Sequence, residues 1–163
     1  MNVTIVRTRR SSPRLSSYDY AQENYYFITA CVRDRKCLFG HVTRGEMVSN
    51  SFGAIVTNCW YDLPHHYHEI HLDGFVLMPN HVHGIVSIHG DAPDGSRAAL
   101  SEIVRAFKSY SARRINEVRE TPGQPVWQRS FYDHIIRNDA DLERIRDYVE
   151  HNPARWAEDR FYE

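Results

Sequence analysis

Residues 78–88 read MPNHVHGIVSI, and this stretch does more than any other to decide the fold. It is typical of a β-strand, because apolar and polar residues alternate after a Pro-Asn turn. Side chains two apart in a strand share a face, so His81 and His83 point the same way. The other face carries apolar residues such as Val82 and Val86. We therefore predict a strand that packs on a core with one face and displays two imidazoles, near the sheet edge, on the other.

The composition is that of one soluble globular domain. The chain has 163 residues, of which 42% are hydrophobic and 25% are charged, enough for a substantial core without disulfide staples. No segment has the length of a membrane span or the apolar core of a signal peptide, so we expect a cytoplasmic protein without a membrane partner. The three cysteines show no paired spacing, and neither a disulfide framework nor a thiolate metal site is indicated.

Charge is distributed unevenly along the chain. The net charge of −1 gives no general support for a nucleic-acid partner. The first acidic residue is Asp19, however, and residues 1–20 read as a basic, flexible arm ahead of a single domain over residues 21–163. Such an arm can contact phosphates, although an ordinary solvated terminus is the alternative. The arginines concerned are Arg7, Arg9, Arg10 and Arg14.

The hydrophobic pattern predicts an alternation of strands and helices. We expect strands over 25–32, 70–78, 81–88 and 126–137, and helices over 47–63, 101–118 and 139–151. Ser101 and Asn138 are the expected N-caps, and Pro153 ends the last helix. A βαββαβ order with an added C-terminal helix predicts an α+β, ferredoxin-like fold with a central antiparallel sheet.

The last predicted helix offers partners for the histidine pair. Tyr148 and Asn152 are four residues apart and therefore neighbours on one helix face, beside the apolar stripe. An amide oxygen suits Mg²⁺ or Mn²⁺, and a phenol can act as a nucleophile. Two histidines leave most coordination positions of an ion open, as a catalytic site requires. A packing role for Tyr148 is the alternative.

Other polar residues have weaker signals. Histidines at positions 65–71 form either a solvated loop or a competing metal cluster. In the last predicted strand, His134 and Arg137 are candidates to support the site or contact DNA, and an ordinary strand histidine is the alternative at His134. On the predicted 101–118 helix, the candidates for phosphate contacts are Arg105, Lys108 and Arg113.

Three motifs in order carry a resemblance to a known family. MPNHVH (78–83), WQRSFYDHIIR (127–137) and RDYVEHNP (146–153) together resemble the REP-associated tyrosine transposases, relatives of the IS200-like transposases in the HUH endonuclease superfamily. The resemblance implies that His81 and His83 bind a divalent cation, Mg²⁺ or Mn²⁺. It also implies that Tyr148 is the catalytic nucleophile and that Asn152 is a third ligand.

The resemblance further implies a reaction and a substrate. We expect an endonuclease and strand transferase that acts on single-stranded DNA with REP-like hairpins through a 5′-phosphotyrosine intermediate, as a monomer or homodimer. The tail after Pro153 is short, so contacts made by a longer extension in some relatives are expected to be absent. A DNA-hairpin-binding protein that keeps the fold without catalysis is the first alternative. An unrelated metalloprotein that uses the histidines at 65–71 is the second.

Overall fold

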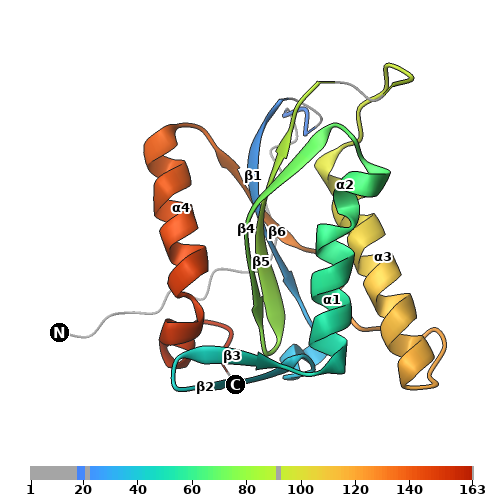
Figure 1. Ribbon diagram of the computed structural model, residues 1–163, viewed down its shortest axis with the longest axis vertical. Helices are drawn as coiled ribbons and strands as arrows, with labels where there is room; N and C mark the ends of the chain where they lie inside the picture. The colour runs from blue at the N-terminus through green and yellow to red at the C-terminus, as the bar shows by residue number, and fades with distance from the viewer. Residues whose placement is uncertain (1–17, 21–22, 91–92, 163) are drawn as a thin grey trace.

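The computed structural model describes residues 18–20, 23–90 and 93–162, which form a four-stranded sheet with helices on both faces (Figure 1). The predicted N-terminal contacts Arg7, Arg9, Arg10 and Arg14 lie outside the described residues. The strands are β1 (Asn24–Cys31), β2 (Gly40–Thr43), β3 (Glu46–Ser49), β4 (Ile70–Met78), β5 (His81–Ile88) and β6 (Tyr132–Ile136). The helices are α1 (Ser51–Tyr61), α2 (Leu63–His66), α3 (Leu100–Val118) and α4 (Asp139–His151), with 3₁₀ turns η1 (Arg33–Arg35) and η2 (Pro153–Glu158).

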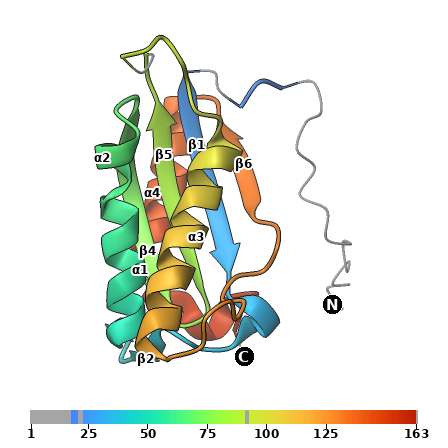
Figure 2. The same cartoon turned by 90° about the vertical axis from the view of Figure 1, so that its right-hand side faces the viewer.

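The sheet has the order β4-β5-β1-β6, and each neighbouring pair is antiparallel. Helix α1 connects β1 to β4, and helix α3 connects β5 to β6. Both helices cover one face of the sheet, while α4 covers the other (Figure 2). This arrangement confirms the predicted ferredoxin-like βαββαβ core with a C-terminal helix.

Strand β5 presents apolar side chains on one face of the sheet and the two histidines on the other, as predicted. Val82 and Val86 belong to the larger apolar cluster, which also contains Trp60 of α1. The indole lies directly over Gly84, where a Cβ atom would come within 2.4 Å of it. The prediction that the histidines lie near the sheet edge is wrong, because β5 runs between β4 and β1 and both imidazoles are buried. Alternation predicts which face of the strand carries the histidines, but it does not predict how deeply they are buried.

Helix α4 lies across the face that displays the histidines. Its apolar stripe, Leu142, Ile145 and Val149, packs against Phe27 and Ile85 of the sheet. The helix begins where predicted, since the Asn138 side chain accepts a hydrogen bond from the backbone of the first turn. At residues 73–74 the register of β4 shifts, and a Cβ atom at Gly74 would lie 3.4 Å from Val149 of the helix. Among the described residues, no helix has both the length and the apolarity needed to cross a bilayer.

The helix predicted over 47–63 is shorter than expected. Its first residues form β3, which pairs with β2 in a small hairpin turned by Gly45 at φ +76°. Helix α1 begins only after Asn50, whose side chain caps the Gly53 amide. Pro64 stands at the start of the short helix α2, where its missing N–H costs nothing.

Two boundaries near α3 also differ from the predictions. The N-cap is Ala99, so Ser101 lies inside the first turn and is not the cap. The strand predicted over 126–137 is restricted to β6, with one isolated bridge between Val32 and Trp127 before it. In between, the Lys108 ammonium group of α3 donates to the backbone carbonyls of residues 128–130, which lie outside β6.

Candidate metal centre and nucleophile

The two histidines of β5 converge on one point. Their Nε2 atoms lie 3.1 Å apart. On the far side of each ring, His83 Nδ1 lies 2.7 Å from Thr29 Oγ1, and His81 Nδ1 lies 2.8 Å from Asn80 Oδ1. An Nδ1–H group that donates to such an oxygen leaves the lone pair on Nε2. When both rings have this tautomer, the two lone pairs face each other at this distance and repel unless a cation lies between them.

The surroundings fix this tautomer at His81 and keep both rings neutral. The Asn80 amide nitrogen donates to two backbone carbonyls, including that of Phe161, so its oxygen is the atom that faces His81. Burial, assisted by the positive charge of Arg160, lowers the pKa of His81 to about 3. Burial and the neighbouring His81 hold the pKa of His83 well below its usual value. Neutral imidazoles are the form that binds metals.

Tyr148 projects from α4 toward the same point. Its hydroxyl oxygen lies 3.4 Å from Nε2 of His83, and its ring packs edge-on against Phe27 and His83. Burial and the nearby carboxylate of Asp159 raise the pKa of the phenol, and the Asn152 amide opposes that rise. The hydroxyl group is therefore protonated at neutral pH, and the nearby charges determine how readily it ionises.

Two oxygen atoms in this region are buried and without a hydrogen-bond partner: Oδ1 of Asn152 and Oδ2 of Asp159. The Asp159 oxygen lies 3.8 Å from Nε2 of His81. The ligand atoms of His81, His83 and Asp159 all lie within 4.8 Å of one another. An unpaired buried oxygen is costly, and carboxylate and amide oxygens are ligands that Mg²⁺ and Mn²⁺ prefer. The residues present therefore fit a divalent cation.

The chain after α4 contributes more than the sequence predicts. We expected a short tail that lacks the contacts of a longer extension, and this short tail folds back over the histidines. The Phe161 ring centroid lies 4.6 Å from that of His81, and Trp156 approaches the same ring from η2. This fold brings the Asp159 side chain, only 2% exposed, to the site. A sequence signal for it is the set of three large aromatic residues in a tail rich in charge: Trp156, Phe161 and Tyr162.

The structure brings His81, His83, Tyr148 and Asn152 into one region and distributes the other predicted residues elsewhere. His134 lies on β6, where it pairs with Asp141 of α4 at 2.8 Å, and Arg137 is exposed between β6 and α4. The candidates on α3 lie on the opposite side of the sheet (Figure 2). These are Arg105, Lys108 and Arg113, the last with its guanidinium group over the Tyr110 ring.

The histidines at 65–71 do not form a second cluster. His65 and His66 each approach the exposed carboxylate of Asp62, and His66 stacks on Tyr110. His71 lies apart on β4, next to His89. Within residues 18–20, 23–90 and 93–162, the group arranged to hold a metal ion is the one at His81, His83 and Asp159.

Two bacterial proteins are similar to the chain in sequence. An uncharacterised protein of Haemophilus influenzae is 35% identical to the chain, over 94% of this chain and 93% of that protein. A provisionally named REP-associated tyrosine transposase of the same organism is 24% identical, over 86% of this chain and 77% of its own length.

Solved structures show the same fold. The structure of a REP-associated tyrosine transposase bound to a REP hairpin matches 91% of this chain and 72% of that chain, with a TM-score of 0.60 at 19% identity. A provisionally named transposase of Deinococcus radiodurans matches 82% of this chain and 93% of its own, with a TM-score of 0.52 at 17% identity. The family described as "Transposase IS200 like" matches residues 21–152. The chain therefore belongs to the IS200-like transposase family.

Proposed function

We propose that this protein is a metal-dependent endonuclease and strand transferase for single-stranded DNA, with Tyr148 as its nucleophile. The observation that carries the proposal is the position of the Tyr148 hydroxyl, 3.4 Å from Nε2 of His83 and beside two unpaired buried oxygens. A nucleophile and a set of metal ligands at one point are what phosphodiester cleavage requires.

Four residues would hold the cation: His81, His83, Asn152 and Asp159. The first three match the prediction from sequence, and Asp159 is added because its buried carboxylate is aimed at His81. When bound, Mg²⁺ or Mn²⁺ would stabilise negative charge on the scissile phosphate. Phe161 covers His81, so the phosphate would approach along the half-buried Tyr148 ring.

The reaction is a transfer of the phosphate to the protein. The Tyr148 phenol loses its proton to solvent, and its oxygen attacks the phosphorus atom. The bond from phosphorus to the 3′ oxygen breaks, and that oxygen takes up a proton to leave as a free 3′-hydroxyl. The 5′-phosphotyrosine link conserves the energy of the broken bond, so a second 3′-hydroxyl can rejoin the strand without a nucleotide cofactor.

The substrate class in the proposal is DNA that carries a hairpin. A structural relative is a REP-associated tyrosine transposase bound to a REP hairpin, and the palindromes in this protein's own genomic neighbourhood are the first substrates to test. A hairpin-binding protein without catalytic turnover is the competing hypothesis, and the same experiment decides between them.

The test combines an adduct assay with a metal-binding assay. Wild-type protein incubated with a hairpin oligonucleotide and Mn²⁺ or Mg²⁺ should form a denaturant-resistant adduct. Tyr148→Phe should lose the adduct and keep Mn²⁺ binding, because the ring remains and only the nucleophile is removed. Tyr61→Phe, which changes an exposed tyrosine on α1, is the matched control and should keep both. The double variant His81→Ala/His83→Ala should lose Mn²⁺ binding, measured by the electron paramagnetic resonance signal of the free ion.

An adduct that persists in Tyr148→Phe would refute the assignment of the nucleophile. Tight hairpin binding by wild-type protein with no adduct under either metal would favour the non-catalytic alternative.

A further inference from the structure

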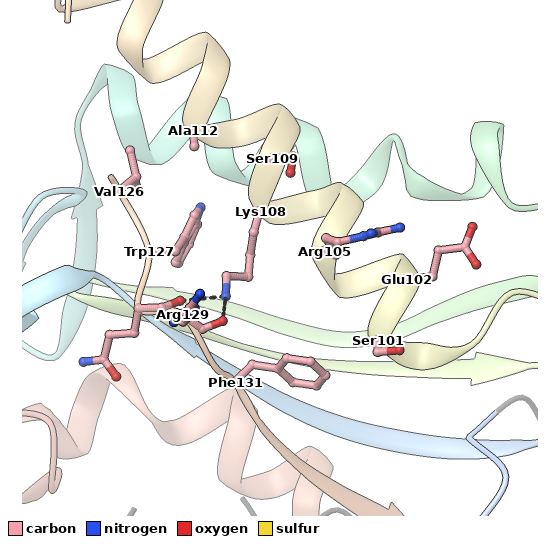
Figure 3. Close-up of a pocket in the computed structure, with 11 residues that line it drawn as sticks. Ser101, Glu102, Arg105, Lys108, Ser109, Ala112, Val126, Trp127, Arg129 and Phe131 are labelled. Atoms are coloured by element: carbon pink, nitrogen blue, oxygen red, sulfur yellow. Dashed lines mark hydrogen bonds between the residues drawn. The ribbon is translucent and has the colours of Figure 1, made fainter. Parts of the chain in front are cut away.

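A second concave site lies on the face of the sheet opposite Tyr148, between α3 and the chain that leads into β6 (Figure 3). Its volume is about 640 Å³, within the range of pockets that hold small molecules. Charged side chains from both walls line it, with Arg105, Lys108 and Glu102 on α3 and Arg129 on the opposite chain. Three cationic groups against one carboxylate favour an anionic ligand.

The pocket is rigid because its second wall is tied to α3. The Lys108 ammonium group donates to the backbone carbonyls of Gln128 and Arg129 at 2.7 and 3.1 Å. The Trp127 indole nitrogen donates to the buried Ser111 hydroxyl at 3.0 Å. These bonds hold the backbone of residues 127–130 in one conformation, and a preformed site binds with a smaller entropic cost.

The lining suits one nucleotide of an unpaired strand. The Arg105 and Arg129 side chains are exposed, and guanidinium groups bind phosphate oxygens in a forked geometry. Phe131 also lines the pocket (Figure 3), where its ring offers an apolar contact for a base or sugar. A nucleotide can enter a pocket of this shape only when it is not paired in a duplex.

A short path along the sheet edge connects this pocket to the metal centre. Tyr132 pairs across the sheet with Thr29, whose hydroxyl group contacts His83. Strands are about 5 Å apart, so Tyr132 lies roughly 10 Å from the histidine strand. Tyr132 is 40% exposed, and its ring contacts Phe27 of that face, whereas the preceding residue, Phe131, belongs to the other face. A single strand of DNA that passes over the edge of β6 would therefore reach both sites.

We infer that this pocket binds an unpaired nucleotide of the DNA strand whose phosphate is cleaved at Tyr148. The inference rests on the proposed function for the identity of the strand. The DNA strand then has a second contact with the protein, beyond the metal centre, and Arg105 binds one of its phosphates directly. Lys108 acts differently, because it positions the wall that carries Arg129.

The test measures DNA binding without cleavage, in the Tyr148→Phe background. The probes are a labelled oligothymidine of about twelve nucleotides, a length within the usual range of single-strand binding sites, and a duplex of equal length. Arg105→Gln/Arg129→Gln should weaken single-strand binding about tenfold and reduce the salt slope by about 1.4, because each phosphate that is no longer neutralised lowers the slope by about 0.7. Duplex binding should not change. Arg44→Gln/Arg144→Gln, which removes two exposed arginines outside the pocket, should leave single-strand affinity intact.

A second readout places the strand directly. Single strands that carry 5-iododeoxyuridine should crosslink to the peptide that contains Trp127 and Phe131. Unchanged affinity in the pocket variant, or equal reductions for single strand and duplex, would overturn the inference. If wild-type protein forms no adduct while the pocket variant loses single-strand binding, the proposed function fails and the pocket stands.

Discussion

The two faces of the central sheet are closed in different ways. The face under α1 and α3 is covered by a large apolar cluster that includes Trp60 and Phe107. The face under α4 has a smaller apolar cluster around Phe27 and Ile85, and buried polar groups lie beside it, among them the two histidines. The first face supplies most of the buried apolar area that stabilises the fold. The second can therefore hold polar groups that are costly to bury.

Polar contacts compensate for the small apolar area under α4. The Arg146 guanidinium group binds both carboxylate oxygens of Asp73 on β4, at 2.9 and 2.6 Å. Near the start of the helix, His134 of β6 pairs with Asp141. These contacts hold α4 across the sheet from both sides, and with it the Tyr148 hydroxyl. The face under α1 and α3 is thus held mainly by apolar packing, whereas the face under α4 also depends on hydrogen bonds and ion pairs.

The largest stability effect is expected from a change on the apolar face. In Gly84→Ala the new methyl group would come within 2.4 Å of the Trp60 indole, and both residues are buried. Overpacking of this kind costs about 1–3 kcal/mol. We expect a loss of about 2 kcal/mol in the free energy of unfolding, measured by urea denaturation.

Gly74→Ala is the matched control on the face under α4. There the methyl group would meet the end of the Ile85 side chain at 3.3 Å and Val149 at 3.4 Å, so small shifts accommodate it. We expect a loss of less than about 1 kcal/mol. A larger loss from Gly74→Ala than from Gly84→Ala would contradict the proposed division between the faces.

The next effect concerns the polar groups of the second face. Asp159→Asn keeps the size of the side chain and removes the negative charge beside His81. If Asp159 is a ligand, the affinity for Mn²⁺ should fall about tenfold, as losses around metal sites typically do. Isothermal titration calorimetry measures this directly. The control is Glu158→Gln, which removes an exposed charge one residue away and should bind Mn²⁺ normally.

Equal affinities in wild type and Asp159→Asn would show that the carboxylate only closes the site. In that case the ligand set would be reduced to the histidines and Asn152, the set predicted from sequence.

The periodicity of the sequence was sufficient to predict the apolar face of the sheet under α1 and α3, and part of the face under α4. Alternation placed His81 and His83 on one side of β5, and helical spacing placed Tyr148 with Asn152. Both inferences rest on the periods of strand and helix, which the chain obeys here. Burial of the histidines could not be read in the same way, because it depends on the position of β5 in the sheet.

The contribution of the tail has a different character. Asp159 lies beside His81, and the Asn80 amide nearby donates to the Phe161 carbonyl at 2.7 Å, across a long stretch of sequence. No local period encodes such a contact. The same limit applies to residues 47–49, which a helical period fits but which pair with β2 instead. Tertiary pairing overrides local propensity at both places.

The smallest predicted effect tests the bonds that hold α4. The Arg146 guanidinium group keeps the pKa of the Asp73 carboxyl group below its usual value. The unfolded chain therefore binds this proton more readily, and the ion pair adds stability above pH ~4, which is lost as the pH falls below that value. Because both groups are partly exposed, Asp73→Asn should cost only about 1 kcal/mol at pH 7. The difference from wild type in urea denaturation should shrink at pH ~3.5. Glu143→Gln removes the charge of the more exposed partner of Arg146 and should cost less stability at pH 7 than Asp73→Asn. A larger loss from Glu143→Gln would show that the ion pair within α4, and not the one to β4, is the more stabilising.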